Sequence, residues 1–191
     1  MTSRRALIVG GLAGLAAVTA WLLFFALPRW YGRSRAPSGI AAVAGVPVPS
    51  GRKIKANLFY VAEDGQRLMS VEHDVAFGEG TVEQARQILE AQLARVAEPL
   101  VSAVPEGTKL RTIFITARGD AFVDLSREFV ARHTGGSTNE LLTIYTIVNV
   151  LGANLPAVRS VELLVDGKQL ETLAGHVDLR HALEKNLAWV Q

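Results

Sequence analysis

The chain has 191 residues, of which 49% are hydrophobic and none is cysteine. This length and composition exclude a disordered, collagen-like or disulfide-built protein and leave room for one ordinary domain with appendages. The net charge of +2 is unevenly placed, because residues 1–51 hold five arginines and no acid, whereas residues 52–191 hold 15 basic and 18 acidic residues. A mildly acidic globular part argues against a nucleic-acid-binding function, so we expect no nucleic-acid partner.

An uncharged apolar run near the N-terminus has the features of a membrane anchor. Residues 6–27 contain no charge and are flanked by Arg4-Arg5 on one side and by Trp30-Tyr31 on the other. A helix of these 22 residues is about 33 Å long, which is enough to cross a hydrocarbon core of about 30 Å. The apolar region of a cleaved signal peptide is shorter, at about 7 to 15 residues. We therefore predict an uncleaved transmembrane helix over residues 6–27.

The charges beside this anchor do not decide its orientation. Two arginines and the terminal amine precede it and three arginines follow it, so the positive-inside comparison is tied.

Residues 28–51 are rich in proline, glycine and alanine, which predicts an extended tether. Within the anchor, Ala6, Gly10 and Gly14 form a ridge of small residues that favours helix pairing in a bilayer, so a homo-oligomer is one expected assembly.

The first elements of the globular part are a hairpin and an amphipathic helix. Residues 54–61 read as a strand, and residues 71–77 alternate between apolar and polar side chains, with the turn pair Asp64-Gly65 between the two segments. Thr81 and Gln84 then have capping-box spacing. The helix predicted from there to Pro99 has its apolar face on Val82, Ala85, Leu89, Leu93 and Val96.

A second strand pair and a central helix follow. Residues 110–117 and 121–124 read as strands around the turn Arg118-Gly119-Asp120. Ser126 is expected to cap a short helical turn, and Ser137 with Glu140 repeats the capping-box spacing. The residues after Glu140 are apolar on most sides of a helix, which predicts a buried helix ending at Asn154-Leu155-Pro156.

The last predicted elements are a hairpin and a terminal helix. Residues 161–165 and 168–173 flank Asp166-Gly167, and Asp178 is expected to cap a helix that includes residues 181–191 as a helical tail. The order of elements is dominated by hairpins. We therefore predict an α+β fold, a largely antiparallel sheet with two main helices packed on it, preceded by one transmembrane helix.

Several segments of the globular part resemble the GerMN domain, the domain of a sporulation and spore germination protein. The segments that carry the resemblance are the opening strand with Asp64-Gly65, residues 105–108, 122–129, His133, residues 135–137, 140–149, 161–173 and 175–179. They cover almost all of residues 52–180, which we assign to a GerMN-like domain. The motif set is distinctive, because it involves many positions in one order.

This resemblance implies a non-enzymatic domain that is tethered to a membrane and lies outside the cytoplasm. It also implies a fold akin to ring-building modules of secretion systems, and in spore formers the relatives help build a complex across the envelope. The sequence departs from that pattern by having one such domain instead of two and an apolar anchor instead of a lipidated cysteine. The sporulation role itself therefore does not transfer directly.

Acidic residues around the second strand pair suggest an alternative, enzymatic function. Asp120, Asp124 and Glu128 could supply acid and base groups, with His133 close in sequence. The simpler interpretation places Asp120 in a turn and puts Asp124 and Glu128 at the start of the Ser126 helix, where acids interact favourably with the helix dipole. We favour the simpler interpretation and predict no catalytic residue.

Other motifs also have structural explanations. His176, Asp178 and His181 have the residue types of a metal site but lack a compact ligand frame, and the chain lacks Gly-x-Ser-x-Gly and cysteine nucleophiles. Residues 134–137 lack the lysine and the spacing of a phosphate-binding loop, so a turn followed by a helix cap explains them. We expect no metal and no cofactor.

The sequence thus favours a single-pass inner-membrane protein whose GerMN-like domain is a non-catalytic scaffold of the cell envelope. Its expected partners are envelope proteins or peptidoglycan, and residues 1–5 are expected in the cytoplasm. The alternative is a peptidoglycan-acting envelope hydrolase or its regulator. These expectations rest on the resemblance and on the anchor pattern.

The orientation can be tested with reporters fused after Gln191. A reporter that is active only in the cytoplasm should stay silent there, while one that is active only outside should give signal, because the resemblance places residues 36–191 outside the cytoplasm. Enzyme activity of both fusions in intact cells is the measurement. Strong activity of the cytoplasmic reporter would reverse the orientation.

Overall fold

The computed structural model describes Trp21 and residues 51–191, and the fold is that of residues 51–191. The predicted anchor, apart from Trp21, and the predicted tether, apart from Gly51, lie outside the described residues, as does the ridge at Ala6, Gly10 and Gly14. Within the described part of the chain, no helix is both long and apolar enough to cross a bilayer.

The first sheet is the hairpin formed by β1 (Lys53–Val61) and β2 (Leu68–Ala76). The strands pair antiparallel along their full length, from Lys53 opposite Ala76 to Val61 opposite Leu68. In the connection, the Asp64 carboxylate accepts hydrogen bonds from the backbone amides of Gln66 (2.9 Å) and Arg67 (3.2 Å). The hairpin predicted around Asp64-Gly65 is confirmed.

The second sheet has five strands: β3 (Leu110–Ile115), β4 (Asp120–Leu125), β5 (Ser160–Val165), β6 (Lys168–Gln169) and β7 (Leu183–Glu184). The order is β3-β4-β5-β6, and β7 also pairs with β5. Only β4 and β5 are parallel among these pairs, because the long connection between them crosses over through a helix. The α+β class and the mostly antiparallel pairing are confirmed, but the strands form two sheets instead of one.

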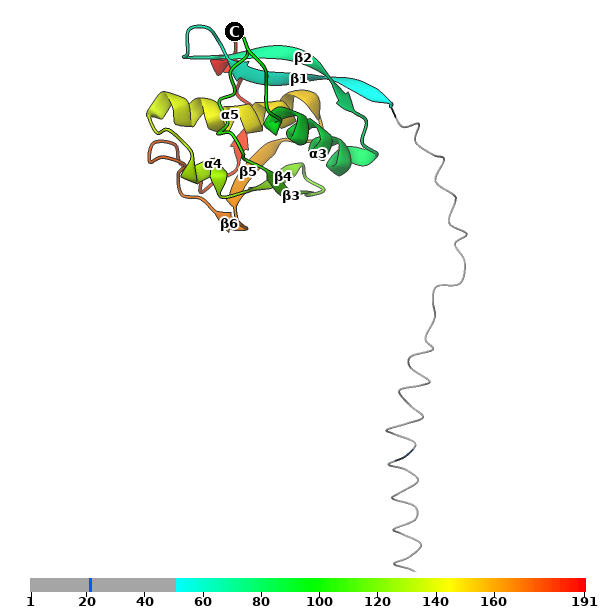
Figure 1. The fold of residues 1–191 in the computed structure, drawn as a ribbon. Helices are drawn as coiled ribbons and strands as arrows, with labels where there is room; N and C mark the ends of the chain where they lie inside the picture. The colour runs from blue at the N-terminus through cyan, green and yellow to red at the C-terminus, as the bar shows by residue number, and fades with distance from the viewer. Residues whose placement is uncertain (1–20, 22–50) are drawn as a thin grey trace, which may run out of the picture. The chain divides into compact units, whose positions relative to one another are not determined.

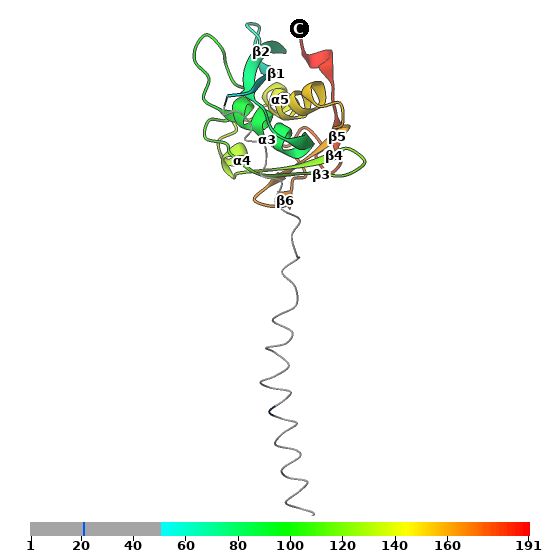
Figure 2. The same ribbon diagram turned by 90° about the vertical axis from the view of Figure 1, so that its right-hand side faces the viewer.

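Helices α3 (Gly80–Leu93) and α5 (Ser137–Asn154) lie between the two sheets, with β1 and β2 on one side and β3, β4 and β5 on the other (Figures 1 and 2). The short α4 (Glu128–Ala131) follows β4 in the chain. Helix α5 contacts both sheets, and α3 contacts α5 and β3. The apolar residues of α5 that are buried are Leu142, Ile144, Ile147, Val148, Val150 and Leu151. The predicted central helix is confirmed.

The outer edge of β1 is closed by amide side chains of the helices. Gln92 of α3 accepts a hydrogen bond from the Phe59 amide and donates one to the Phe59 carbonyl, both at 2.8 Å. Asn154, the last residue of α5, does the same with the amide and carbonyl of Asn57, again at 2.8 Å. These side chains satisfy main-chain groups of β1 that a third strand would otherwise pair.

The predicted capping boxes are wrong. Helix α3 begins at Gly80, and Gln84 accepts a hydrogen bond from the Gly78 amide (3.0 Å) and donates one to the Ala76 carbonyl (3.1 Å). No side chain caps α3 or α5, whose N-cap residues are Glu79 and Gly136. Helix α3 also ends at Leu93, before Val96 and Pro99, and Val82 is 41% exposed while Ile88 and Gln92 are buried. The packed face of α3 is therefore rotated from the predicted one.

The predicted helical tail at residues 181–191 is wrong as well. The segment pairs with β5 through β7 and then forms a single 3₁₀ turn at Leu187–Trp189. The Asn149 side chain donates to the Asn186 carbonyl and accepts from the Asn186 amide, both at 2.9 Å. Backbone groups of the segment bond to β5 and to the Asn149 side chain. The segment is therefore extended, although the helical spacing of its leucines predicted a helix.

The turn at Arg118-Gly119-Asp120 is confirmed. Gly119 has a φ of +93°, and a Cβ at this position would lie 2.4 Å from the carbonyl oxygen of Ala157. Only glycine fits both the left-handed backbone and the close approach. The hairpin at Asp166-Gly167 is present too, although β6 is limited to Lys168–Gln169.

We predict that replacing Gln92 with Leu lowers the free energy of unfolding by about 3 kcal/mol, because the buried amide and carbonyl of Phe59 lose their partners. Chemical denaturation measures the difference. Gln87→Leu on the same helix is the control, since Gln87 bonds only to the Glu83 side chain, and it should change stability by less than about 0.5 kcal/mol. Equal effects of the two variants would contradict the role of Gln92.

Candidate functional site

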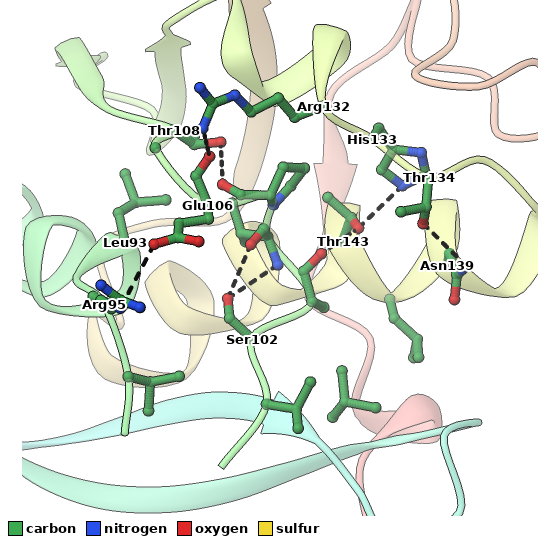
Figure 3. A pocket seen from close by; sticks show the side chains of 18 of the residues that line it. Leu93, Arg95, Ser102, Glu106, Thr108, Arg132, His133, Thr134, Asn139 and Thr143 are labelled. Carbon is green, nitrogen blue, oxygen red and sulfur yellow. Dashed lines mark hydrogen bonds and ion pairs between the residues drawn. The ribbon is translucent and has the colours of Figure 1, made fainter. Parts of the chain in front are cut away.

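A cavity of about 940 Å³ opens between the end of α3, the loop that follows it and the start of α5 (Figure 3). Its lining combines apolar and charged side chains. The buried apolar members are Val104 and Leu142, and Val61, Leu93 and Val96 are partly buried. Val101 also lines the cavity and is 57% exposed. The size and the mixed lining are typical of a binding site.

The charged side chains of the cavity are mostly basic. Arg95, Lys109 and Arg132 line it, against the single acid Glu106. The Nε atom of Arg95 lies 3.6 Å from the Glu106 carboxylate, and Arg132 donates a hydrogen bond to the Glu106 carbonyl at 3.0 Å. Both contacts are drawn in Figure 3. The surplus of cations favours an anionic ligand.

His133 also lines the cavity, and both of its ring nitrogens are engaged. Its Nδ1 atom accepts a hydrogen bond from the Gly135 amide at 3.0 Å, so the ring proton is on Nε2. Nε2 lies 3.2 Å from the Thr143 hydroxyl, which itself donates to the Ala103 carbonyl at 2.7 Å. Both ring nitrogens therefore have partners, and the imidazole links the segment before α5 to the helix.

Asp120 belongs to its turn, as the simpler interpretation predicted. Its carboxylate accepts hydrogen bonds from the hydroxyls of Ser160 (3.0 Å) and Thr116 (3.1 Å). The Ser160 hydroxyl and then the Thr116 hydroxyl hold the pKa of Asp120 below its usual range. The group is ionised at neutral pH, which does not suit a general acid.

Asp124 does not serve the start of the Ser126 helix, so that expectation is wrong. The Asp124 carboxylate accepts a hydrogen bond from the Gly167 amide at 2.8 Å and pairs with the Nε atom of Arg111 at 3.1 Å. Arg111 also pairs with Asp166 in the same turn. Asp124 thus fixes the β5–β6 turn to the neighbouring strands.

Glu128 lies in the first turn of α4, as predicted. A hydrogen bond from the Ser126 side chain is the main cause that lowers the pKa of Glu128. Ser126 itself does not cap the helix, because its hydroxyl oxygen accepts from the Lys109 amide at 3.0 Å and Arg127 is the N-cap residue. The three acids and His133 are each held by different partners, so the structure does not assemble them as a catalytic group.

The most buried acid of the described fold is Glu140, whose role the sequence did not reveal. Its carboxylate accepts hydrogen bonds from the amides of Leu173, Ala174, His176 and Val177, at 2.9 to 3.2 Å. The side chain is fully buried. Burial alone would raise the pKa of Glu140, but hydrogen bonds from these amides lower it below the ordinary value of 4.5. An ionised Glu140 therefore holds the loop before residue 178.

Two of the three residues with the types of a metal site, His176 and Asp178, have other partners, and the third, His181, is exposed. The Nδ1 atom of His176 lies 2.9 Å from the Glu140 carboxylate. Asp178 accepts two hydrogen bonds from the Arg180 guanidinium, at 2.9 and 2.7 Å, and Arg180 holds the pKa of Asp178 well below its usual range. Among residues 51–191 no group of three His, Asp or Glu side chains is arranged to hold a metal ion.

The sequence and fold can be compared with those of known proteins. A family model described as "Germane: Sporulation and spore germination" matches residues 57–171, which is more than half of the chain. The chain belongs to this family. No curated protein sequence matches it.

Solved structures of other proteins share the fold. The first GerMN domain of the sporulation protein GerM from Bacillus subtilis matches with a TM-score of 0.56 and 18% identity, over 69% of this chain and 97% of that one. The tandem GerMN domains of the same protein match with a TM-score of 0.55 and 14% identity, over 70% of this chain and 46% of that one. A candidate lipoprotein of Clostridium perfringens matches with a TM-score of 0.50 and 20% identity, over 70% and 88% of the two chains.

We predict that Glu140→Gln lowers the free energy of unfolding at pH 7 by about 3 kcal/mol, because charge-assisted hydrogen bonds to the loop amides become neutral ones. The folded-state pKa of Glu140 is depressed, so its stabilisation is present above about pH 4.5 and is lost as the pH falls through the lower folded-state value. Urea denaturation at pH 7 and at pH 3 should show the difference between variant and wild type shrinking in acid.

The control is Glu90→Gln, because Glu90 is an exposed acid on α3. This variant should change stability by less than about 0.5 kcal/mol at either pH. A Glu140→Gln difference that stays constant between the two pH values would contradict an ionised Glu140 in the folded state.

Proposed function

We propose that this protein is a membrane-anchored, non-catalytic scaffold whose GerMN domain lies outside the cytoplasm and binds envelope proteins or peptidoglycan. The observation that carries the proposal is the way in which the fold uses its acids and histidines. Asp120, Asp124, Glu140 and His133 all hold backbone or neighbouring side chains, so the most reactive residue types serve the architecture. The cavity retains features that suit binding.

The membrane location is supported by the sequence and by the names of similar proteins. One solved structure with this fold is described as a lipoprotein, and a lipoprotein is held at a membrane by its lipid. This chain has no cysteine for such a lipid, and the apolar residues 6–27 would serve the same purpose. Self-association through the ridge at Gly10 and Gly14 is part of the proposal.

We propose a role for this chain that is less specific than the family description. The GerM relative is named a sporulation protein and carries tandem domains, whereas this chain matches 46% of that tandem structure, which corresponds to one domain. We therefore propose the scaffold function without the sporulation process.

The proposal predicts binding without turnover. The tagged full-length protein, crosslinked in native membranes, should give discrete species with another protein, or it should sediment with purified peptidoglycan. Soluble fragments should not be released from that peptidoglycan. Gel analysis and chromatography of the supernatant are the measurements.

Two results would contradict the scaffold in different ways. Release of soluble peptidoglycan fragments that is abolished by Asp124→Asn or Glu128→Gln would favour the hydrolase alternative. A protein that neither crosslinks to a partner nor sediments with peptidoglycan would have no scaffold function. A lysozyme digestion serves as the positive control for fragment release.

A further inference from the structure

The basic side chains at the cavity are available to a ligand. The Arg95 side chain is 87% exposed and its contact with Glu106, which is 73% exposed, is a single ion pair at 3.6 Å. An exposed pair of this kind contributes little free energy, so an incoming carboxylate can replace it. Arg132 and Lys109 line the same cavity and are exposed. Three cations can therefore meet an anionic ligand.

Buried aliphatic side chains line the cavity together with these cations. Leu142 is 1% exposed and Val104 is 6% exposed, and both line the cavity from within the core. Val101, at 57% exposure, extends this apolar surface to the outside. An exposed aliphatic side chain beside arginines is a combination found at protein interfaces, where arginine is enriched and apolar residues form the centre.

We infer that this cavity binds an extended, acidic segment of another envelope protein. Aliphatic side chains of the segment would contact Val101 and Leu142, and its carboxylates would pair with Arg95, Lys109 and Arg132. Charge complementarity selects an acidic partner, because Glu106 is the only acid among the described residues that line the cavity. The inference rests on the proposed scaffold function and adds the chemistry of the partner.

The test uses a library of random dodecapeptides displayed on phage and selected on the immobilised full-length protein in detergent micelles. Selection should enrich peptides that combine Asp or Glu with Val, Leu or Ile. Synthetic versions of the enriched peptides, labelled with a fluorophore, then serve as probes in anisotropy titrations. Their affinity should fall with rising salt concentration, as expected for binding that depends on charge pairs.

Arg95→Glu should lower the affinity of these peptides by about tenfold or more, which corresponds to the loss of one favourable charge pair. The matched control is Arg118→Glu. The Arg118 side chain is also 87% exposed and makes one ion pair, with Asp120 at 3.3 Å, but it does not line the cavity. The control should leave the peptide affinity unchanged, and an equal loss in both variants would overturn the site.

A second pair of variants tests the apolar surface. Val101→Asp should abolish detectable peptide binding, because it places a like charge where the acidic segment lies. Phe114→Asp is its control, since Phe114 on β3 is 61% exposed and does not line the cavity. Thermal unfolding of each variant confirms that the fold is kept. Loss of binding in Phe114→Asp alone would move the site to the second sheet.

Three further results would overturn the inference. The first is the absence of any enriched peptide, and the second is the enrichment of basic peptides. The third is a crosslinked homodimer of the full chain that Val101→Asp removes, because a second copy of the chain would then be the occupant of the cavity. If Val101→Asp and Arg95→Glu still crosslink to a partner in membranes as the wild type does, the cavity assignment fails while the scaffold function stands. If the wild type captures no partner, the scaffold function itself fails.

Discussion

Helix α5 is buried on nearly all sides, so each polar side chain that it carries into the interior needs a partner there. Glu140 holds the amides of the loop before residue 178, Thr143 bonds to the Ala103 carbonyl, Asn149 clamps Asn186, and Asn154 clamps Asn57. Every one of these contacts reaches backbone in a different part of the chain. The helix therefore organises the hairpin, the loops and the C-terminal segment around itself.

The cavity is a by-product of the same arrangement. Thr143 fixes the segment that begins at Ala103, and His133 fixes the approach to α5, which leaves Leu142 at the bottom of the space between them. These contacts tie the walls of the cavity to the core, which suits the proposed binding. The side chains of Arg95 and Lys109, which also line the cavity, take no part in these contacts.

The parts of the fold that depend on local pattern could be predicted from the sequence. Alternation around Asp64-Gly65 gave the first hairpin, and the apolar run after Glu140 gave the central helix. The capping-box spacing of Gln84 and Glu140 was misleading. A side chain three residues after a possible cap has this spacing whether it caps its own helix or bonds elsewhere, and Glu140 bonds to the Leu173 amide. The cavity combines segments from Val61 to Thr143, and no local pattern brings such distant segments together.

The amide clamps on β1 have a consequence for sequence divergence. On β1, the Gln92 and Asn154 side chains bond to the main-chain amide and carbonyl of Phe59 and Asn57, and every residue type except proline offers that same pair of groups. The strand can therefore change its side chains without disturbing these contacts, while the two helix positions cannot change theirs. Contacts of this kind tolerate changes in the side chains of the strand, and the fold of this chain is shared with a GerM domain that is only 18% identical.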